Sequence, residues 1–221
     1  MKKYKAAHFL FLYMFFCALL LVFFSFSVQA STLFPKKTVY FGVNMGGGST
    51  EWRYLVDSQH VDPATPKHVS EGGPSWGLVV GYDVSKNFEL EAQYMQFANA
   101  NITFNSISTY SYPELHGATS IISRTDAISV SARFLAQLGH SHLRAFAAIG
   151  PGLVQRVDAL AKTKSAVAPY MSGGLVYSFT RHWMLESGFQ YYTGFGRSSL
   201  HPVRYFIPFV WDAYGRLAYQ L

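Results

Sequence analysis

The chain has 221 residues, a length that suits one domain. Only 14% of the residues are charged and 17% are aromatic, whereas a typical soluble domain is about 25% charged. The formal net charge is +6, but the arginines are dispersed and form no basic stripe, so the composition argues against a nucleic-acid partner. No apolar run after residue 30 approaches the length of a membrane helix, which favours a membrane β-barrel over a helical membrane protein.

The N-terminus has the three parts of a secretory signal peptide. Three lysines within the first five residues precede an uncharged apolar run over residues 9–28, and a Val-Gln-Ala triplet follows. We therefore predict a signal peptide over residues 1–30 that is cleaved between Ala30 and Ser31. The alternative is a retained membrane helix, because the run is long enough to span a bilayer.

The only cysteine, Cys17, lies within this apolar run and lacks the preceding small residues of a lipoprotein signal. The exported chain would contain no cysteine, so neither a disulfide nor a thiolate metal site is expected. Removing the three lysines would lower the net charge from +6 to about +3.

The exported chain alternates between apolar and polar residues with a period of two, as strands do when their two faces meet different surroundings. The first expected strand covers residues 38–46, and a long polar loop separates it from the second, 74–83. After a tight turn, the third strand, 88–98, carries Glu89 and Glu91 on one face. Two glutamates on one face suit a polar lumen with basic partners better than a dry core.

A second polar loop leads to the fourth expected strand, residues 120–138, which places Arg133 opposite its apolar face. The fifth strand, 142–154, contains Arg144. Its phase stays open because both faces are small and apolar. Residues 155–165 are expected to form the third loop.

The sixth and seventh strands, 168–179 and 183–193, are joined by a tight turn, and Glu186 lies opposite the apolar face of the seventh. A fourth loop leads to the last strand, 204–221. One face of this strand is free of charge, whereas the other carries Asp212 and Arg216.

Short and long connections alternate between the eight expected strands. An even strand number with long loops on one side is the pattern of bacterial outer-membrane barrels, whose short turns are periplasmic. We therefore predict an all-β fold, an eight-stranded antiparallel up-and-down transmembrane β-barrel over residues 31–221, located in the outer membrane of a Gram-negative bacterium. The alternative is a soluble lipocalin-like barrel, which would crowd the aromatic residues of all eight strands into one small lumen.

Two hairpins resemble those of the OmpA-like, opacity-protein-type family of small outer-membrane barrels. Residues 76–82 and 87–94 are similar to that family's Gly-rich strand and its Leu-Glu-x-x-Tyr strand, and residues 168–191 resemble a second such hairpin. The alternating apolar residues up to Leu221 resemble the assembly signal of outer-membrane proteins.

This resemblance implies a monomeric barrel in contact with outer-membrane lipid, with lipopolysaccharide and with the outer-membrane assembly machinery. Its loops would bind a host surface ligand. No cofactor, metal or nucleic acid is expected, and the chain is not expected to be an enzyme.

The phases of the strands place seven charged side chains in the lumen. Because an unpaired charge in so narrow a space is costly, we expect these side chains to pair and to plug the barrel. The alternatives are a narrow porin-like channel and glycosidase chemistry by paired carboxylates. The expected lumen residues are Glu89, Glu91, Arg133, Arg144, Glu186, Asp212 and Arg216.

A second set of residues consists of large aromatic side chains near strand ends or on the apolar face. Such residues form the girdles of membrane barrels at the two lipid–water interfaces, and a carbohydrate-binding platform is the alternative. The expected girdle residues are Trp76, Tyr82, Trp183, Tyr191, Tyr205, Trp211 and Tyr219.

The triplet from His68 to Ser70, followed by Glu71, is similar to the His-x-Ser pair of lipid A deacylases. In those enzymes the pair lies on a membrane strand, whereas here it lies in a loop that contains prolines, so a lipid-modifying enzyme is only a second alternative. His60 and His68 form a weak metal-binding pattern.

Overall fold

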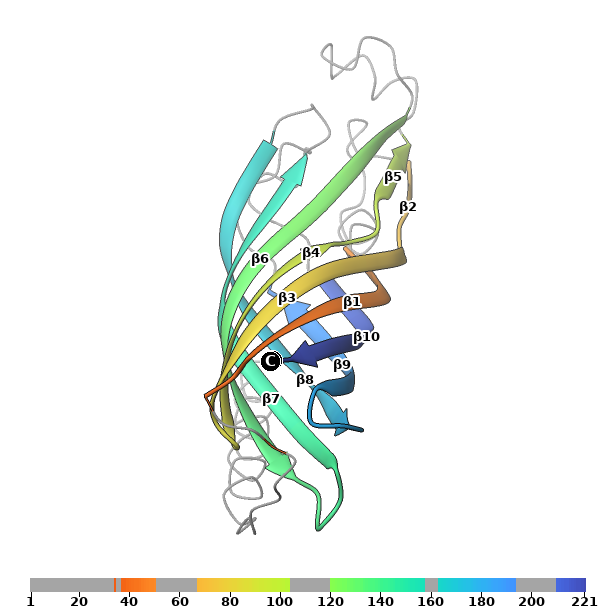
Figure 1. Ribbon diagram of the computed structural model, residues 1–221. Helices are drawn as coiled ribbons and strands as arrows, with labels where there is room; N and C mark the ends of the chain where they lie inside the picture. The colour runs from red at the N-terminus through yellow and green to blue at the C-terminus, as the bar shows by residue number, and fades with distance from the viewer. Residues whose placement is uncertain (1–33, 35–36, 51–66, 104–119, 158–162, 194–209) are drawn as a thin grey trace, which may run out of the picture.

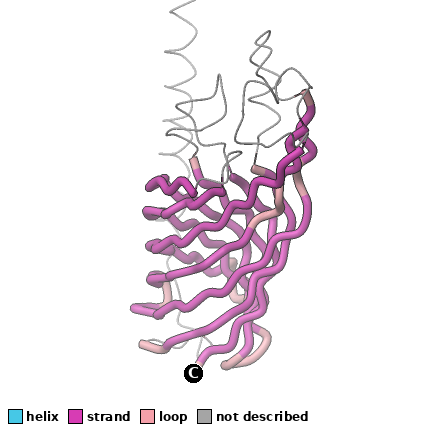
Figure 2. The backbone as a smooth tube through the Cα atoms, turned by 90° about the horizontal axis from the view of Figure 1, so that it is seen from above, coloured by secondary structure: helices cyan, strands magenta, loops and turns pink. Residues whose placement is uncertain are grey.

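The computed structural model describes residues 34, 37–50, 67–103, 120–157, 163–193 and 210–221 (Figure 1). All regular structure within these ranges is β-strand (Figure 2), and no helix there is long and apolar enough to cross a membrane. The strands are β1 (Val39–Ser49), β2 (His68–Ser70), β3 (Gly73–Ser85), β4 (Phe88–Gln96), β5 (Ala100–Thr103), β6 (Ser120–Gln137), β7 (Leu143–Val157), β8 (Thr163–Ser178), β9 (Trp183–Tyr192) and β10 (Val210–Gln220).

Eight of these strands close into an antiparallel barrel, which confirms the predicted fold. Their order is β6-β4-β3-β1-β10-β9-β8-β7, and a further pairing between β6 and β7 completes the ring. The first and last strands meet along a ladder that runs from Tyr40 opposite Gln220 to Ser49 opposite Trp211. Closure pairs the backbone groups of the wall within the sheet, as a hydrocarbon surrounding requires.

The short connections β3–β4, β6–β7 and β8–β9 lie at one end of the barrel, which the outer-membrane pattern makes the periplasmic end. The connections after β1, β5, β7 and β9 leave the opposite, extracellular end. At the periplasmic end, the backbone N–H of Leu221 donates to Val39 O at 3.0 Å, and that of Lys37 donates to Asp83 O at 2.7 Å. These bonds tie the beginning and the end of the described barrel together.

Two short strands form a projection where the sequence pattern predicts loops. At its extracellular end β6 pairs with β5 along Ser120–Ser123, and β5 pairs with β2. We call β2, β5 and Ser120–Ser123 the flap, which rises beyond the barrel in Figure 1. Strands of three and four residues show too little alternation to be recognised from sequence.

Strands β7 and β8 also extend farther than expected, because their ladder continues to Val157 opposite Thr163. Much of the expected third loop, residues 155–165, is therefore strand. The structure also settles the phase of β7. Arg144 and Phe146 are buried in the lumen, whereas Ile149 faces outward.

The outer surface of the barrel is apolar around its whole circumference. Large side chains from every wall strand are exposed there, including Phe41 on β1, Leu90 on β4, Phe134 on β6 and Leu185 on β9. The opposite face of each strand turns into the lumen and carries the polar and charged residues. This inside-out distribution matches a wall that is surrounded by lipid.

Glycines on the inward face make room for large lumen side chains. A Cβ atom added to Gly81 would lie 2.0 Å from Cζ of Tyr40, and one added to Gly77 would lie 2.1 Å from Sδ of Met95. The glycines of β3 are therefore explained by the packing of the lumen.

Candidate functional site

Four charged side chains from four different strands meet near the middle of the lumen. Arg133 Nη2 lies 2.7 Å from Glu186 Oε2, and Arg216 Nη1 lies 2.5 Å from Glu91 Oε2. Arg133 also contacts Glu91, and Arg216 Nη1 lies 3.3 Å from Glu186 Oε2. Each arginine thus contacts both glutamates, and we call these four residues the ion-pair ring.

Two tyrosines complete the hydrogen bonding of the glutamates in this ring. The Tyr40 hydroxyl donates to Glu91 Oε2 at 2.7 Å, and the Tyr214 hydroxyl donates to Glu186 Oε1 at 2.7 Å. Buried charges are tolerated when they are both paired and hydrogen-bonded. The tyrosines therefore stabilise the ion-pair ring in a lumen that excludes bulk water.

The arginines of the ring have neutral neighbours as well. Nε of Arg216 donates to Asn44 Oδ1 at 2.6 Å. The guanidinium of Arg133 lies over the ring of Phe146, 4.3 Å from its centroid, in the geometry of a cation–π contact. These contacts orient both guanidinium groups toward the glutamates.

A further ion pair extends the ring toward the periplasm. Glu89 lies 3.5 Å from Arg144 Nη1 and 3.6 Å from Arg133 Nε. The Arg144 guanidinium lies 4.5 Å from the ring centroid of Phe34, which is itself buried. With Glu89 and Arg144 included, three carboxylates face three guanidinium groups, so the charges balance.

Asp212, which we expected in the same network, lies at another level of the lumen. Its carboxylate accepts hydrogen bonds from Ser75 Oγ and, at 3.1 Å, from Gln190 Nε2. Among the described residues it forms no ion pair. Asp212 and Arg216 share the inward face of β10, but four residues of strand separate them by about 13 Å.

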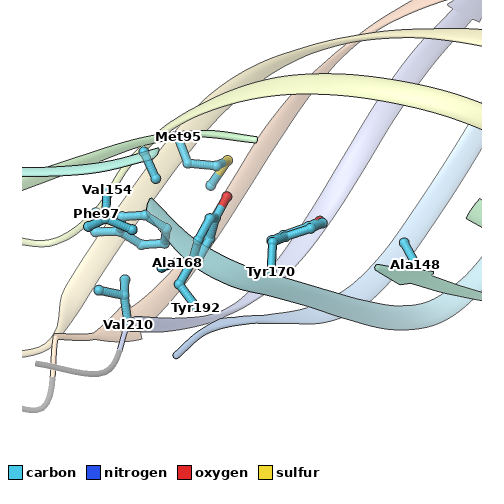
Figure 3. Close-up of a cluster of buried hydrophobic side chains, with 9 residues drawn as sticks. Met95, Phe97, Ala148, Val154, Ala168, Tyr170, Tyr192 and Val210 are labelled. Atoms are coloured by element: carbon cyan, nitrogen blue, oxygen red, sulfur yellow. The ribbon is translucent and has the colours of Figure 1, made fainter. Parts of the chain in front are cut away.

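Neutral groups surround Asp212 and continue the network toward the extracellular end. Gln93 Nε2 donates to Gln190 Oε1 at 2.8 Å and to the Tyr192 hydroxyl at 3.1 Å. Above them, Phe97 packs edge-on against Tyr192 with ring centroids 5.7 Å apart. Figure 3 shows these rings beside Val154 and Val210, with the Tyr192 hydroxyl pointing toward Met95.

Two charged residues of the lumen were not predicted from the sequence. Asp83 is buried near the periplasmic mouth, where it accepts hydrogen bonds from Gln220 Nε2 and, at 3.1 Å, from Thr38 Oγ1. The alternation of β3 already placed Asp83 on the inward face, so the signal was present. Arg156 is also buried, but the sequence pattern predicts a loop for its segment.

Six of the seven expected girdle residues lie on the outward face, in two bands. Trp183 and Tyr219 pack edge-on at 5.0 Å near the periplasmic end, and Trp76 packs against Tyr94 at 5.9 Å near the other end. Tyr82 belongs to the periplasmic band, whereas Tyr191 and Trp211, which are partners in the β9–β10 ladder, belong to the extracellular band. The seventh, Tyr205, lies outside the described residues, as do Ala30 and Ser31.

The His-x-Ser residues considered for lipid-modifying chemistry lie outside the lumen. His68 and Ser70 lie on the flap, exposed and paired with Thr103 and Asn101 of β5. Glu71 accepts a hydrogen bond from Thr50 Oγ1 at 3.4 Å. Among the described residues no three His, Cys, Asp or Glu side chains are grouped as metal ligands, and His60 lies outside these residues.

Comparison with known proteins agrees with the barrel geometry. The family model described as "Outer membrane protein beta-barrel domain" matches residues 16–202, which is most of the chain. No curated protein sequence matches.

Two solved structures illustrate the shared fold. Neisserial surface protein A is 12% identical and has a TM-score of 0.53, with 83% of this chain and 97% of that chain covered. The outer membrane protein OprG of Pseudomonas aeruginosa is 11% identical and has a TM-score of 0.51, with 84% and 97% covered. At these identities the likeness shows the fold alone.

Proposed function

Because this chain belongs to the outer-membrane protein β-barrel family, we propose that it is a closed, non-conducting anchor in the outer membrane. The anchor presents the extracellular connections and the flap to the surroundings of the cell. A host surface ligand would be bound there, and the barrel wall would hold the binding segments in place.

The observation that supports this proposal most strongly is the ion-pair ring. It links β4 and β6 on one side of the lumen with β9 and β10 on the other. An eight-stranded barrel is only wide enough for side chains to fill its interior. With the amides and aromatic rings above the ring, little room remains for a path through which solutes could pass.

The arrangement of the connections supports the second part of the proposal. The connections after β1, β5, β7 and β9 all leave the extracellular end, and the flap lengthens the wall between two of them. Binding segments are commonly loops that a rigid scaffold positions. The first two connections, residues 51–66 and 104–119, are the main candidates for ligand contact.

Neither alternative gains support from the geometry. For a channel, Arg133 and Arg216 would have to line an open path, but they are engaged by Glu91 and Glu186. For a lipid-modifying enzyme, His68 and Ser70 would have to meet an acyl chain, but they lie on the flap.

Planar-bilayer recording of the purified full chain tests the anchor. The wild type should give no stepwise current. The double substitution of Arg133→Ala and Arg216→Ala leaves unpaired carboxylates in the lumen, admits water and should produce current steps. Stepwise current in the wild type that these substitutions abolish would instead establish a channel.

Surface binding forms the second arm of this test. Cells that display the chain with residues 104–119 replaced by a Gly-Ser linker should lose adhesion to host cells, while the barrel remains heat-modifiable on a gel. Unchanged adhesion after replacement of both 51–66 and 104–119 would contradict the assigned role of these connections.

A further inference from the structure

The wall of the barrel is interrupted between β3 and β4 at its extracellular end. The β3–β4 ladder ends with Trp76 opposite Gln96. On one side, β3 stays paired with β1 as far as Gly73. On the other, the backbone N–H of Phe97 donates to Thr125 O on β6 at 3.0 Å. Beyond Trp76 the two strands therefore follow different neighbours and part from each other.

A pocket of about 580 Å³ lies where the strands part, a volume within the range of ligand sites of about 300–1,000 Å³. Met45 and Trp76, which are 69% and 44% exposed, form part of its wall and belong to the apolar outer surface. Ser75 and Phe97 also line it. Ser75 lies on the inward face of β3, and Phe97, which directly follows β4, is buried. The pocket is thus continuous with the lipid-facing surface and reaches into the barrel wall.

The deeper part of this pocket is supported by the lumen. Phe97 packs against Tyr192 in the aromatic cluster of Figure 3, and Ser75 donates to Asp212. Ala98, a small residue, contributes to the pocket from the β4 side. The deeper part of the pocket is therefore built from packed, buried side chains, and the pocket is mostly apolar.

An arginine lies beside this apolar pocket. Arg124 is outward-facing on β6, and its Nη2 donates to Oε1 of Gln96, which lines the pocket, at 3.1 Å. Its side chain is 52% exposed, and its Nε lies 3.7 Å from Asp126 Oδ2. Asp126 also accepts a hydrogen bond from the Tyr94 hydroxyl at 3.2 Å. The guanidinium has further N–H donors that can bind an oxyanion such as a phosphate.

We propose that this pocket and Arg124 bind one molecule of lipid A from the outer leaflet. An acyl chain would occupy the pocket beside Trp76 and Ala98, and a phosphate of the sugar head group would bind Arg124. The pocket lies at the extracellular end, where the wall meets the outer leaflet, and lipid A combines acyl chains with phosphates. The apolar volume and the cation thus match the two parts of this lipid.

A second hollow on the same wall supplies a matched control. It has a volume of about 360 Å³ and is lined by Phe41, Leu78, Ala92, Tyr94 and other residues, none of them charged. Both hollows face lipid. Ala98, which follows β4, lines the larger hollow, and Ala92 on β4 lines the smaller one. They differ in that only the larger one has an arginine beside it.

Native mass spectrometry of the full chain, purified in mild detergent and supplied with lipid A, tests the proposal. The wild type should retain one lipid A molecule. Ala98→Trp, which fills the pocket, and Arg124→Ala, which removes the cation, should each lower the retained fraction at least about tenfold. Ala92→Trp and Arg181→Ala, a change of an exposed arginine at the periplasmic turn, should leave it unchanged.

Three results would overturn the proposal. Retention by Arg124→Ala equal to that of the wild type would remove the phosphate site, and equal losses in the Ala92→Trp variant would show general lipid adhesion. Equal retention of phosphatidylglycerol would show that the site does not select lipid A. Folding of each variant is checked by heat-modifiable gel migration. Should Ala98→Trp not fold, Gln96→Ala takes its place, with a smaller expected loss of lipid A.

Discussion

Arg216 and Leu217 are neighbours on β10 and have opposite surroundings. Arg216 is 1% exposed and contacts two glutamates and Asn44, whereas Leu217 is 48% exposed on the outer wall. A water-soluble protein would reverse this arrangement. The pair shows that the two faces of each strand are matched to different media, hydrocarbon outside and a self-paired polar interior inside.

The lumen places stricter requirements on its side chains than the lipid-facing surface does. A leucine on the outer wall requires only lipid, whereas Arg216 requires partners from β1, β4 and β9 at defined distances. Single substitutions should therefore cost most where a charge inside loses its partner. They should cost less where a charge is placed in lipid, and least where a neutral group inside is removed.

Arg133→Met should have the largest effect on stability. The substitution removes one of the two arginines that contact each of the buried residues Glu91 and Glu186. Breaking a buried ion pair costs about 3–5 kcal/mol. Urea unfolding of the barrel in lipid vesicles, followed by gel migration, measures this loss. Arg181→Met at the exposed β8–β9 turn is the control and should change the free energy of unfolding by less than about 0.5 kcal/mol. A loss below about 1 kcal/mol for Arg133→Met would mean that the ring does not stabilise the lumen.

Leu217→Arg should have the next largest effect, because it places a cation on the lipid face between the two aromatic bands, to which Trp211 and Tyr219 belong. The expected loss is about 2–4 kcal/mol at the bilayer midplane and about 0–1 kcal/mol near the interface. Ile122→Arg is the matched control, because Ile122 is exposed on the flap beyond the barrel. The same vesicle assay compares the two variants. Equal losses of unfolding free energy in the two variants would mean that the flap and the wall have the same surroundings, contrary to the proposed position of the membrane.

Gln93→Ala should have the smallest effect of the three. It removes donors to Gln190 and Tyr192 and leaves buried polar groups without a partner, at a cost of about 1–3 kcal/mol. Gln96→Ala, three residues along β4 from Gln93 and on the outward face, should cost less than about 0.5 kcal/mol. The difference between the two variants measures how much the neutral part of the lumen contributes. Equal free energies of unfolding for the two variants would mean that the charged residues alone stabilise the lumen.

Sequence alternation predicted the two faces well because a period of two is a local property of a strand. It placed Arg133 and Arg216 on the inward side and the apolar faces of their strands on the outward side without knowledge of the neighbouring strands. The same rule applied to β3 would have identified Asp83. The faces of the barrel could therefore be derived from the sequence almost completely.

The partners of each charge could not be derived in this way. Arg216 and Glu91 are 125 residues apart, and their contact depends on how the whole ring of strands closes. Asp212 shares a face with Arg216, but the partners that it meets, Ser75 and Gln190, depend on the register of the strands. The pocket beside Arg124 exists because β3 and β4 part from each other, and no periodic pattern records that event.

Placing Arg216 on β10 has a consequence for biogenesis. Until this terminal strand docks, Glu91 and Glu186 each lack one of their two guanidinium contacts. An unfinished sheet would thus carry surplus negative charge toward the acyl chains, which hydrocarbon strongly disfavours. Insertion of a partial barrel is therefore opposed electrostatically, and the arrival of the final strand acts as a checkpoint that permits entry into the bilayer.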